Sequence, residues 1–421
     1  MNRTNFLAAT AGLIILALLN VLLFNFHIIN ISFFKTELVL CDTVWYNQIK
    51  NDGYLFVPYS MCNLAFFPMF PYFWKLLSVS PLTMGLVNSV LFVFSLSFLL
   101  GRKPRPIIYT LVISSFPSFI FFVLPYSEAL FFLFATALIR GYEKKTPWLV
   151  ILGMFGCSLT RSVSAFFIPA IILTEFLSND GHIRNKIINA TWYSLASLAG
   201  VAITTIIQFI QTGKILYFLT VQRYWGRNFL IPSLPFTTQS ASRVLGVDTI
   251  ALTIGLIAAF FLLCILISHI WPSFFKKPQA IGDRSLVFSL LYLVSIAILD
   301  CFFTGNLGER TNIWSINRHI ICTPFFIYLL DRIFFNYRPS LNEVIFVLTI
   351  IITGILITTL WNYPISLAYY SIFFLSLFLM PISNAFLRLQ RHNIFLAPLY
   401  IFNLLLWIVF MQAFLQDKWI G

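Results

Sequence analysis

Uninterrupted apolar runs recur along most of this 421-residue chain. Runs such as 8–23 and 344–360 contain no charged residue and show no alternation of apolar and polar positions. In lipid, every backbone polar group must be satisfied by the protein, so only helices and closed barrels can cross a bilayer. Barrel strands would alternate apolar and polar positions. The runs therefore predict an all-α polytopic membrane protein.

The composition agrees with a chain solvated by membrane lipids. Hydrophobic residues make up 59% of the sequence and charged residues only 10%, whereas soluble domains carry about 25% charge. The formal net charge is +13, but the basic residues form short clusters between apolar runs. That pattern is typical of cytoplasmic loops facing lipid headgroups. We therefore expect membrane lipids as partners and no nucleic acid.

Thirteen apolar runs are candidate membrane spans, and the first is expected to be retained rather than cleaved as a signal peptide. Several runs are shorter than the roughly 20 residues of an upright span, so the turns near 123–127 and 160–164 are predicted to lie below the membrane surface. The spans are 6–26, 82–100, 106–123, 126–140, 147–160, 164–178, 187–211, 248–270, 285–303, 318–335, 341–360, 365–381 and 393–414.

The distribution of Lys and Arg predicts a cytoplasmic N-terminus, because the short loops on that side hold most of the basic residues. The long segments 27–81, 212–247 and 304–317 then lie outside the cytoplasm. Long ordered loops tend to carry function. We therefore expect one transmembrane domain over residues 1–421, with its chemistry on the extracytoplasmic face.

The first of these loops is predicted to contain two short interfacial helices. Val44, Trp45, Gln48 and Ile49 have helical spacing, and Gly53 follows where a helix would end. The aromatic stretch 65–74 is too short and too rich in proline to span, and its side chains suit the headgroup level. Asp42 would lie at the start of the first helix.

The six cysteines have no metal-ligand spacing. Cys157, Cys264, Cys301 and Cys322 fall in or near predicted spans, where a thiol usually packs as a small hydrophobe. Cys41 and Cys62 lie in one predicted extracytoplasmic loop, so a disulfide between them is possible. We expect no metal site.

The first loop resembles the PIG-V family, the GPI mannosyltransferase 2 enzymes and their bacterial relatives. Cys41, Lys50 and His319 depart from the usual pattern, which affects the acceptor rather than the acid. The matching residues are Asp42, Trp45, Tyr46, Ile49, Gly53, Tyr54, Ala65, Phe66, Phe67, Pro68 and Pro71, with weaker matches at Pro117-Ser118, Tyr126-Ser127-Glu128, Thr160-Arg161-Ser162, Tyr224-Trp225, Ser315-Ile316-Asn317-Arg318-His319 and Pro324.

The resemblance implies a GT-C glycosyltransferase fold. It also implies a polyprenyl-phosphate-mannose donor, a lipid-linked or glycan acceptor and an inverting mechanism, with no cofactor. Asp42 would be the catalytic base, since a carboxylate can take the proton of the attacking hydroxyl. The donor phosphate would be bound by Arg161 and Arg318, with His319 and Arg310 as further candidates, because arginine forks suit phosphate oxygens.

Each candidate also has a structural interpretation. Asp42 could cap its helix, and Arg161 could extend to the membrane surface. Glu128 could bind sugar hydroxyls or pair with Arg161, and Asp300 could pair with an extracytoplasmic Arg. The aromatic candidates for sugar or isoprenoid contact could instead be interface anchors; they are Trp45, Tyr46, Tyr126 and Trp225.

Three other functions stay open from the sequence. The first is a transferase of the same fold that uses another polyprenyl-linked sugar. The second is a lipid or sugar flippase, although pseudo-symmetric halves and mid-membrane charges are not evident. The third is an assembly subunit without chemistry. The form of the motif is closer to bacterial relatives, which predicts a bacterial plasma membrane, with the endoplasmic reticulum as the alternative.

Overall fold

The chain is predominantly helical in the computed structural model, which describes residues 2–163, 167–178, 182–231, 239–240, 247–270, 283–307, 310–313, 315–336 and 392–420. Six helices in these ranges are long and apolar enough to cross a membrane. They are α1 (Arg3–Asn25), α4 (Pro81–Leu100), α9 (Ile183–Thr212), α11 (Val247–Ile270), α12 (Arg284–Phe302) and α17 (His392–Leu415). The prediction of a helical membrane protein is confirmed.

The other predicted spans in the described ranges form shorter helices. The span expected at 106–123 is divided at Pro117, where the chain changes from an α-helix to a 3-10 helix, and α14 begins at Pro324. The predicted spans 341–360 and 365–381 lie outside the described residues. The shorter elements are α5 (Ile107–Ser114), η3 (Pro117–Phe122), α6 (Glu128–Glu143), α7 (Pro147–Thr160), α8 (Phe167–Leu177), α13 (Ile316–Ile320) and α14 (Pro324–Asn336).

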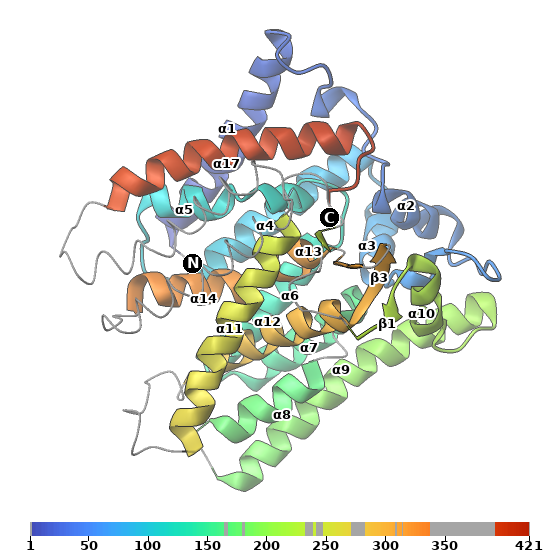
Figure 1. Cartoon of the computed structure of the whole chain (residues 1–421), viewed down its shortest axis with the longest axis vertical. Helices are drawn as coiled ribbons and strands as arrows, with labels where there is room; N and C mark the ends of the chain where they lie inside the picture. The colour runs from blue at the N-terminus through green and yellow to red at the C-terminus, as the bar shows by residue number, and fades with distance from the viewer. Residues whose placement is uncertain are drawn as a thin grey trace.

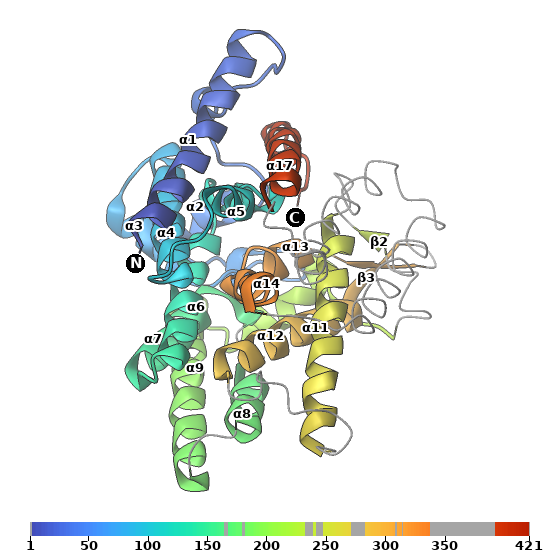
Figure 2. The same ribbon diagram turned by 90° about the vertical axis from the view of Figure 1, so that its left-hand side faces the viewer.

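The helices pack around α6. Helices α6 and α7 form a hairpin, and α7 packs on α9. Helix α6 also contacts α4, α12 and α14. Figures 1 and 2 show α17 lying beside α5, on the far side of the bundle from α8 and α9. One buried apolar core runs through these helices and includes Phe92, Phe122 and Phe132.

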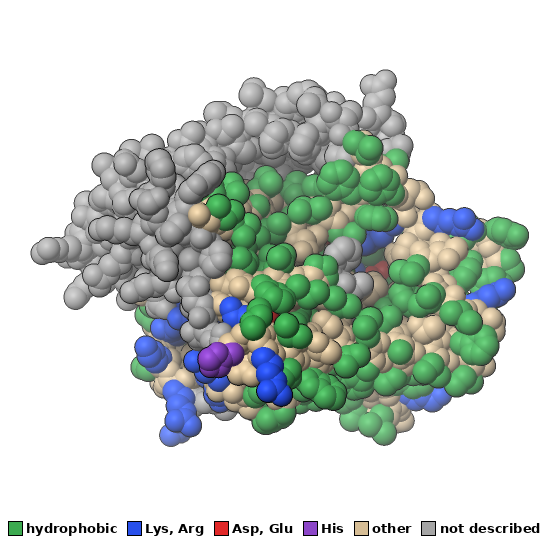
Figure 3. Space-filling model, turned by 90° about the horizontal axis from the view of Figure 1, so that it is seen from below, with side chains coloured by type: hydrophobic (Ala, Val, Ile, Leu, Met, Phe, Trp, Pro, Cys, Tyr) green, Lys and Arg blue, Asp and Glu red, His purple; other side chains and the backbone are tan. Residues whose placement is uncertain are grey.

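Apolar side chains cover much of the outside of the bundle. Leu18 on α1, Val90 on α4 and Trp192 on α9 are each more than half exposed. Hydrophobic side chains dominate the described surface in Figure 3, interrupted by groups of Lys and Arg. Such a surface is stable against lipid tails and costly in water.

The first long loop contains the two predicted helices, α2 (Asp42–Asp52) and α3 (Met69–Leu77). The 3-10 turn η1 (Phe33–Lys35) precedes α2, and the 3-10 turn η2 (Asn63–Ala65) precedes α3. Gly53 ends α2 at φ 82°, and a Cβ there would lie 2.8 Å from Gln211 Oε1. That oxygen accepts from Tyr54 N at 2.7 Å, which ties the loop to the end of α9. Cys41 and Cys62 are both free thiols in the structure.

A small sheet, which the sequence analysis does not predict, connects the other two long loops. Its strands are β1 (Asn228–Phe229), β2 (Gln239–Ser240), β3 (Phe303–Leu307) and β4 (Arg310–Ile313), in the order β1-β3-β4-β2. β3 pairs antiparallel with both β1 and β4, and β2 pairs parallel with β4. The loop before β1 contains α10 (Tyr217–Thr220) and η5 (Val221–Trp225).

Candidate active site

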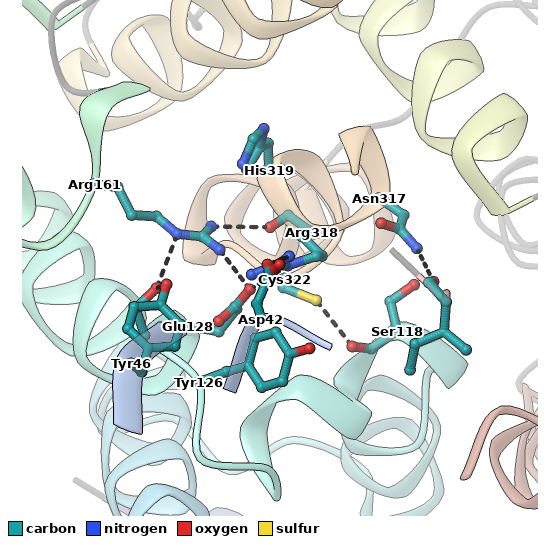
Figure 4. A network of polar contacts seen from close by, with 12 residues as sticks. Asp42, Tyr46, Ser118, Tyr126, Glu128, Arg161, Asn317, Arg318, His319 and Cys322 are labelled. Atoms are coloured by element: carbon teal, nitrogen blue, oxygen red, sulfur yellow. Dashed lines mark hydrogen bonds and ion pairs between the residues drawn. The ribbon is translucent and has the colours of Figure 1, made fainter. Parts of the chain in front are cut away.

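Four charged side chains from four separate elements meet at one end of α6 (Figure 4). Asp42 is the first residue of α2, Glu128 is the first residue of α6, Arg161 follows α7, and Arg318 lies in α13. Arg318 Nη1 donates to Asp42 Oδ2 at 2.5 Å, and its Nε donates to Glu128 Oε1 at 2.6 Å. Because all four side chains are buried, their opposite charges must compensate one another.

Arg161 is the fourth member of this group, and each of its three side-chain nitrogens donates a hydrogen bond to a protein oxygen. Its Nη2 donates to the same Glu128 oxygen as Arg318 does. Its Nε donates to Ser127 Oγ at 3.3 Å, and its Nη1 donates to the carbonyl of Arg318 at 3.5 Å. The ion pair between Glu128 and Arg161, which the sequence analysis gave as one alternative, is therefore present. Glu128 also pairs with Arg318.

The other alternative for Asp42, a helix cap, is wrong. Cys41 occupies the N-cap position of α2 and makes no side-chain capping bond. Asp42 Oδ2 accepts from Arg318, and no backbone amide in the described chain donates to the carboxylate. The carboxylate is held by a guanidinium and directed toward other side chains.

Both helices that carry this ion pair begin from strained backbone. Cys41 has φ 50° and Ser315, which precedes α13, has φ 61°. Non-glycine residues in this region cost free energy that the surrounding structure must supply, and they cluster at functional sites.

The segment 416–420 after α17 contacts the chain at the beginning of both α2 and α13. Asp417 Oδ1 accepts from Cys41 N at 3.3 Å, and Asn317 Nδ2 donates to the carbonyl of Ile420 at 3.3 Å. Burial, together with the negative charges of Asp417 and Asp42, raises the pKa of the Cys41 thiol to about 12. Cys41 is thus a protonated, structural neighbour of Asp42 rather than a nucleophile.

A cavity of about 140 Å³ opens beside the ion pairs. Predicted residues on its wall are Asp42, Tyr46, Arg161, Arg318, His319 and Trp225. Glu128 and Tyr126 are buried behind this wall, and Trp45 does not line it. Arg310 lies in β4, with its side chain outside the described part of the structure.

Aromatic rings support the charged group. Arg318 lies over the faces of Tyr126 and Phe121, at 4.7 and 4.9 Å from the ring centroids. Tyr46 donates its hydroxyl to Ser127 Oγ at 3.0 Å, and burial, with the charge of Glu128, raises its pKa to about 12. Tyr46 therefore stays protonated and acts as a donor.

The two tryptophan candidates meet outside this group. Trp45 packs edge-on against Trp225, with ring centroids 5.3 Å apart, and stacks on Phe66. Only Trp225 of this pair reaches the cavity wall.

Sequence reasoning missed Arg227, which lines the same cavity and forms a second polar group, here named the Asp300 cluster, with the sequence candidates Asp300 and His319. Asp300 lies 3.8 Å from Arg227 Nη1 and 3.8 Å from His319 Nδ1. The expected pairing of Asp300 with an Arg from a predicted extracytoplasmic loop is therefore present. Arg227 carries no local sequence signal beyond its closeness to Trp225, and the cavity residue Trp419 carries none.

The cavity thus combines a buried carboxylate with three guanidinium groups and an imidazole. Such a site can accept a proton and compensate an anionic ligand. The described residues contain no group of three or more His, Cys, Asp or Glu that could hold a metal ion. Comparison of the chain with protein-family models, curated proteins and solved structures found no match.

Proposed function

We propose that this protein is a membrane glycosyltransferase that moves mannose from a polyprenyl-phosphate donor to a hydroxyl of a lipid or glycan acceptor. The observation that carries the proposal is Asp42, a buried carboxylate on the wall of a polar cavity, held by Arg318. The resemblance of the first loop to the PIG-V family supplies the donor class and the sugar. A lipid-linked donor also suits a chain that packs six long apolar helices.

The proposed step is a single inverting displacement. The acceptor oxygen forms a bond to the sugar C1 while the bond from C1 to the phosphate oxygen breaks, and its electron pair leaves with the phosphate. The acceptor proton goes to Asp42. Oδ2 of that carboxylate is engaged by Arg318, whereas Oδ1 has no hydrogen-bond partner among the described residues. Oδ1 is therefore the oxygen available to the incoming hydroxyl.

We further propose that the Glu128 end of α6 faces away from the cytoplasm. The other end of α6 carries Arg140, Lys144 and Lys145, and basic residues favour the cytoplasmic side. The form of the first-loop motif suggests a bacterial plasma membrane. A lumenal site in the endoplasmic reticulum would have the same geometry relative to the cytoplasm.

The test is a transfer assay in proteoliposomes with radiolabelled farnesyl-phosphate mannose and total membrane lipids as acceptors. Mild acid releases sugar from the donor but leaves a glycoside intact. We expect acid-stable product from the wild type and a loss of about 100-fold or more in Asp42→Asn. Asp52→Asn is the matched control, because Asp52 is exposed at the other end of α2.

Other outcomes would contradict the proposal in distinct ways. Product formation that survives Asp42→Asn would exclude Asp42 as the base. Donor that crosses the bilayer without glycoside formation would favour a flippase. Product from a glucosyl donor but not from the mannosyl donor would keep the reaction class and change the sugar.

A further inference from the structure

A second cavity, here named the α1–α4 groove, lies between α1 and α4, which pack against each other (Figure 2). Its volume is about 290 Å³, and all but three of its lining residues are apolar. Ile14, Leu86 and Val90 on its wall are each more than half exposed. The groove therefore opens on the apolar outer surface of the bundle, where lipid tails would meet it.

The α1 side of the groove is one stripe along the helix, because its residues recur at spacings of three and four. Over the 14 positions from its first to its last residue the stripe rises about 21 Å. That length exceeds one leaflet of a hydrocarbon core about 30 Å thick, so an extended lipid chain can lie along it. The stripe consists of Phe6, Thr10, Leu13, Ala17 and Asn20.

The three polar side chains of the groove differ in how they are satisfied. Thr10 and Ser89 each donate a hydroxyl to a carbonyl of their own helix at 2.9 Å. Asn20, which is 1% exposed, accepts from Phe33 N through Oδ1 at 3.3 Å, but its Nδ2 has no partner among the described residues. Because the Phe33 amide is a donor, the amide oxygen must face it, which leaves the NH2 group of Asn20 unpaired.

An unpaired donor in this position needs an acceptor from outside the chain. A buried N–H without a partner is costly, and lipid hydrocarbon offers it no acceptor. Asn20 lies five residues before the end of α1, about 7.5 Å along the helix, near the level where the ester carbonyls of a membrane lipid lie. An isoprenoid chain has no oxygen along its length and would leave Nδ2 unpaired.

We infer that the α1–α4 groove binds an acyl chain of an ester-linked membrane lipid, whose ester carbonyl accepts from Asn20 Nδ2. This ligand differs in class from the prenyl-phosphate donor, and the inference does not depend on the proposed function. Asn20 also holds Phe33 at the start of the first long loop. A lipid bound to Asn20 would therefore stabilise the loop that carries Asp42.

The test compares two probes that differ only in the acceptor. Delipidated full-length protein in detergent is titrated with a dioleoyl ester phospholipid and with its dioleyl ether analogue, and bound lipid is counted by native mass spectrometry. We expect the wild type to bind one ester lipid at least about fivefold more tightly than the ether lipid, because an ether oxygen is the weaker acceptor. Asn20→Leu should bind the two lipids equally.

Thr10→Val is the matched control, because Thr10 lies on the same stripe and already uses its hydroxyl within α1; it should keep the preference. Ala17→Trp should fill the groove and weaken the binding of both lipids. A thermal unfolding curve checks that each variant is folded.

Three results would overturn the inference. The first is equal binding of the two lipids by the wild type. The second is a full preference for the ester in folded Asn20→Leu. The third is farnesol binding that Ala17→Trp blocks while ester-lipid binding stays unchanged, because the groove would then hold a prenyl chain.

Discussion

Helix α6 has a glutamate at each end, and the two ends hold their charges differently. Glu128 is fully buried, and the side chains of its partners Arg161 and Arg318 are 7% and 5% exposed. Glu143 is 19% exposed, and it pairs with Arg140 and with Arg332, which is 31% exposed. About 22 Å of helix separates the two glutamates. At the Glu143 end water can replace a lost partner, whereas at the Glu128 end it cannot.

The contrast indicates different roles for two superficially similar ion-pair networks. Ion pairs that are accessible to water contribute little to stability. The pairs at the Glu143 end are of this kind, because their side chains are partly exposed. A buried group of four charges that borders a cavity is expensive to assemble. Such a group is more common at a functional site than in a purely structural one.

The largest predicted difference concerns the two glutamates. Glu128→Gln leaves two buried guanidinium groups with one carboxylate, that of Asp42, which pairs with Arg318, and should lower the free energy of unfolding by about 3–5 kcal/mol. Glu143→Gln should cost about 1 kcal/mol or less, because its partners are partly solvated. Chemical unfolding in detergent micelles measures both values. Equal costs at the two ends would invalidate the comparison.

An intermediate effect is expected when Arg is replaced by Lys at each end. Arg318 uses two different nitrogens to join Asp42 and Glu128, a bridge that a single ammonium cannot reproduce. Arg318→Lys should therefore reduce transfer by at least about tenfold. Arg332 contacts Glu143 and Asp283 through Nη2 alone, so Arg332→Lys should transfer at the wild-type rate. Loss of transfer in both variants would show that the two ends are not functionally distinct.

The smallest effect separates stability from activity. Tyr46 and Tyr328 each donate a hydroxyl, to Ser127 at one end and to Glu143 at the other. Either Tyr→Phe substitution should cost about 1 kcal/mol of unfolding free energy. Only Tyr46→Phe should also slow transfer, by several-fold, because Ser127 is a partner of Arg161. Equal transfer rates in the two variants would remove Tyr46 from the site.

Features with local causes could be predicted from the sequence. The long helices follow from uninterrupted apolar runs, and α2 follows from the spacing of Val44, Trp45, Gln48 and Ile49, with Gly53 at its end. Asp42 is a candidate because of the resemblance of the first loop, Arg318 because of the weaker resemblance around it, and Arg161 also because of the high cost of charge in an apolar context.

Features that depend on distant residues could not be predicted. Glu128 pairs with Arg318, 190 positions later, and Asn228 of β1 pairs with Thr304 of β3, 76 positions later. Arg227 and Trp419 reach the cavity only because the loop before β1 and the segment after α17 fold onto it. No local periodicity or composition distinguishes them from other loop residues.

The most direct test of the central claim is a structure with a non-transferable donor, the phosphonate analogue of farnesyl-phosphate mannose. The account predicts the sugar in the cavity beside Asp42. Its C1 should lie within roughly 6 Å of the Asp42 carboxylate, which leaves room for one hydroxyl oxygen between them. A headgroup bound elsewhere on the protein, with the Asp42 cavity closed to it, would contradict the account.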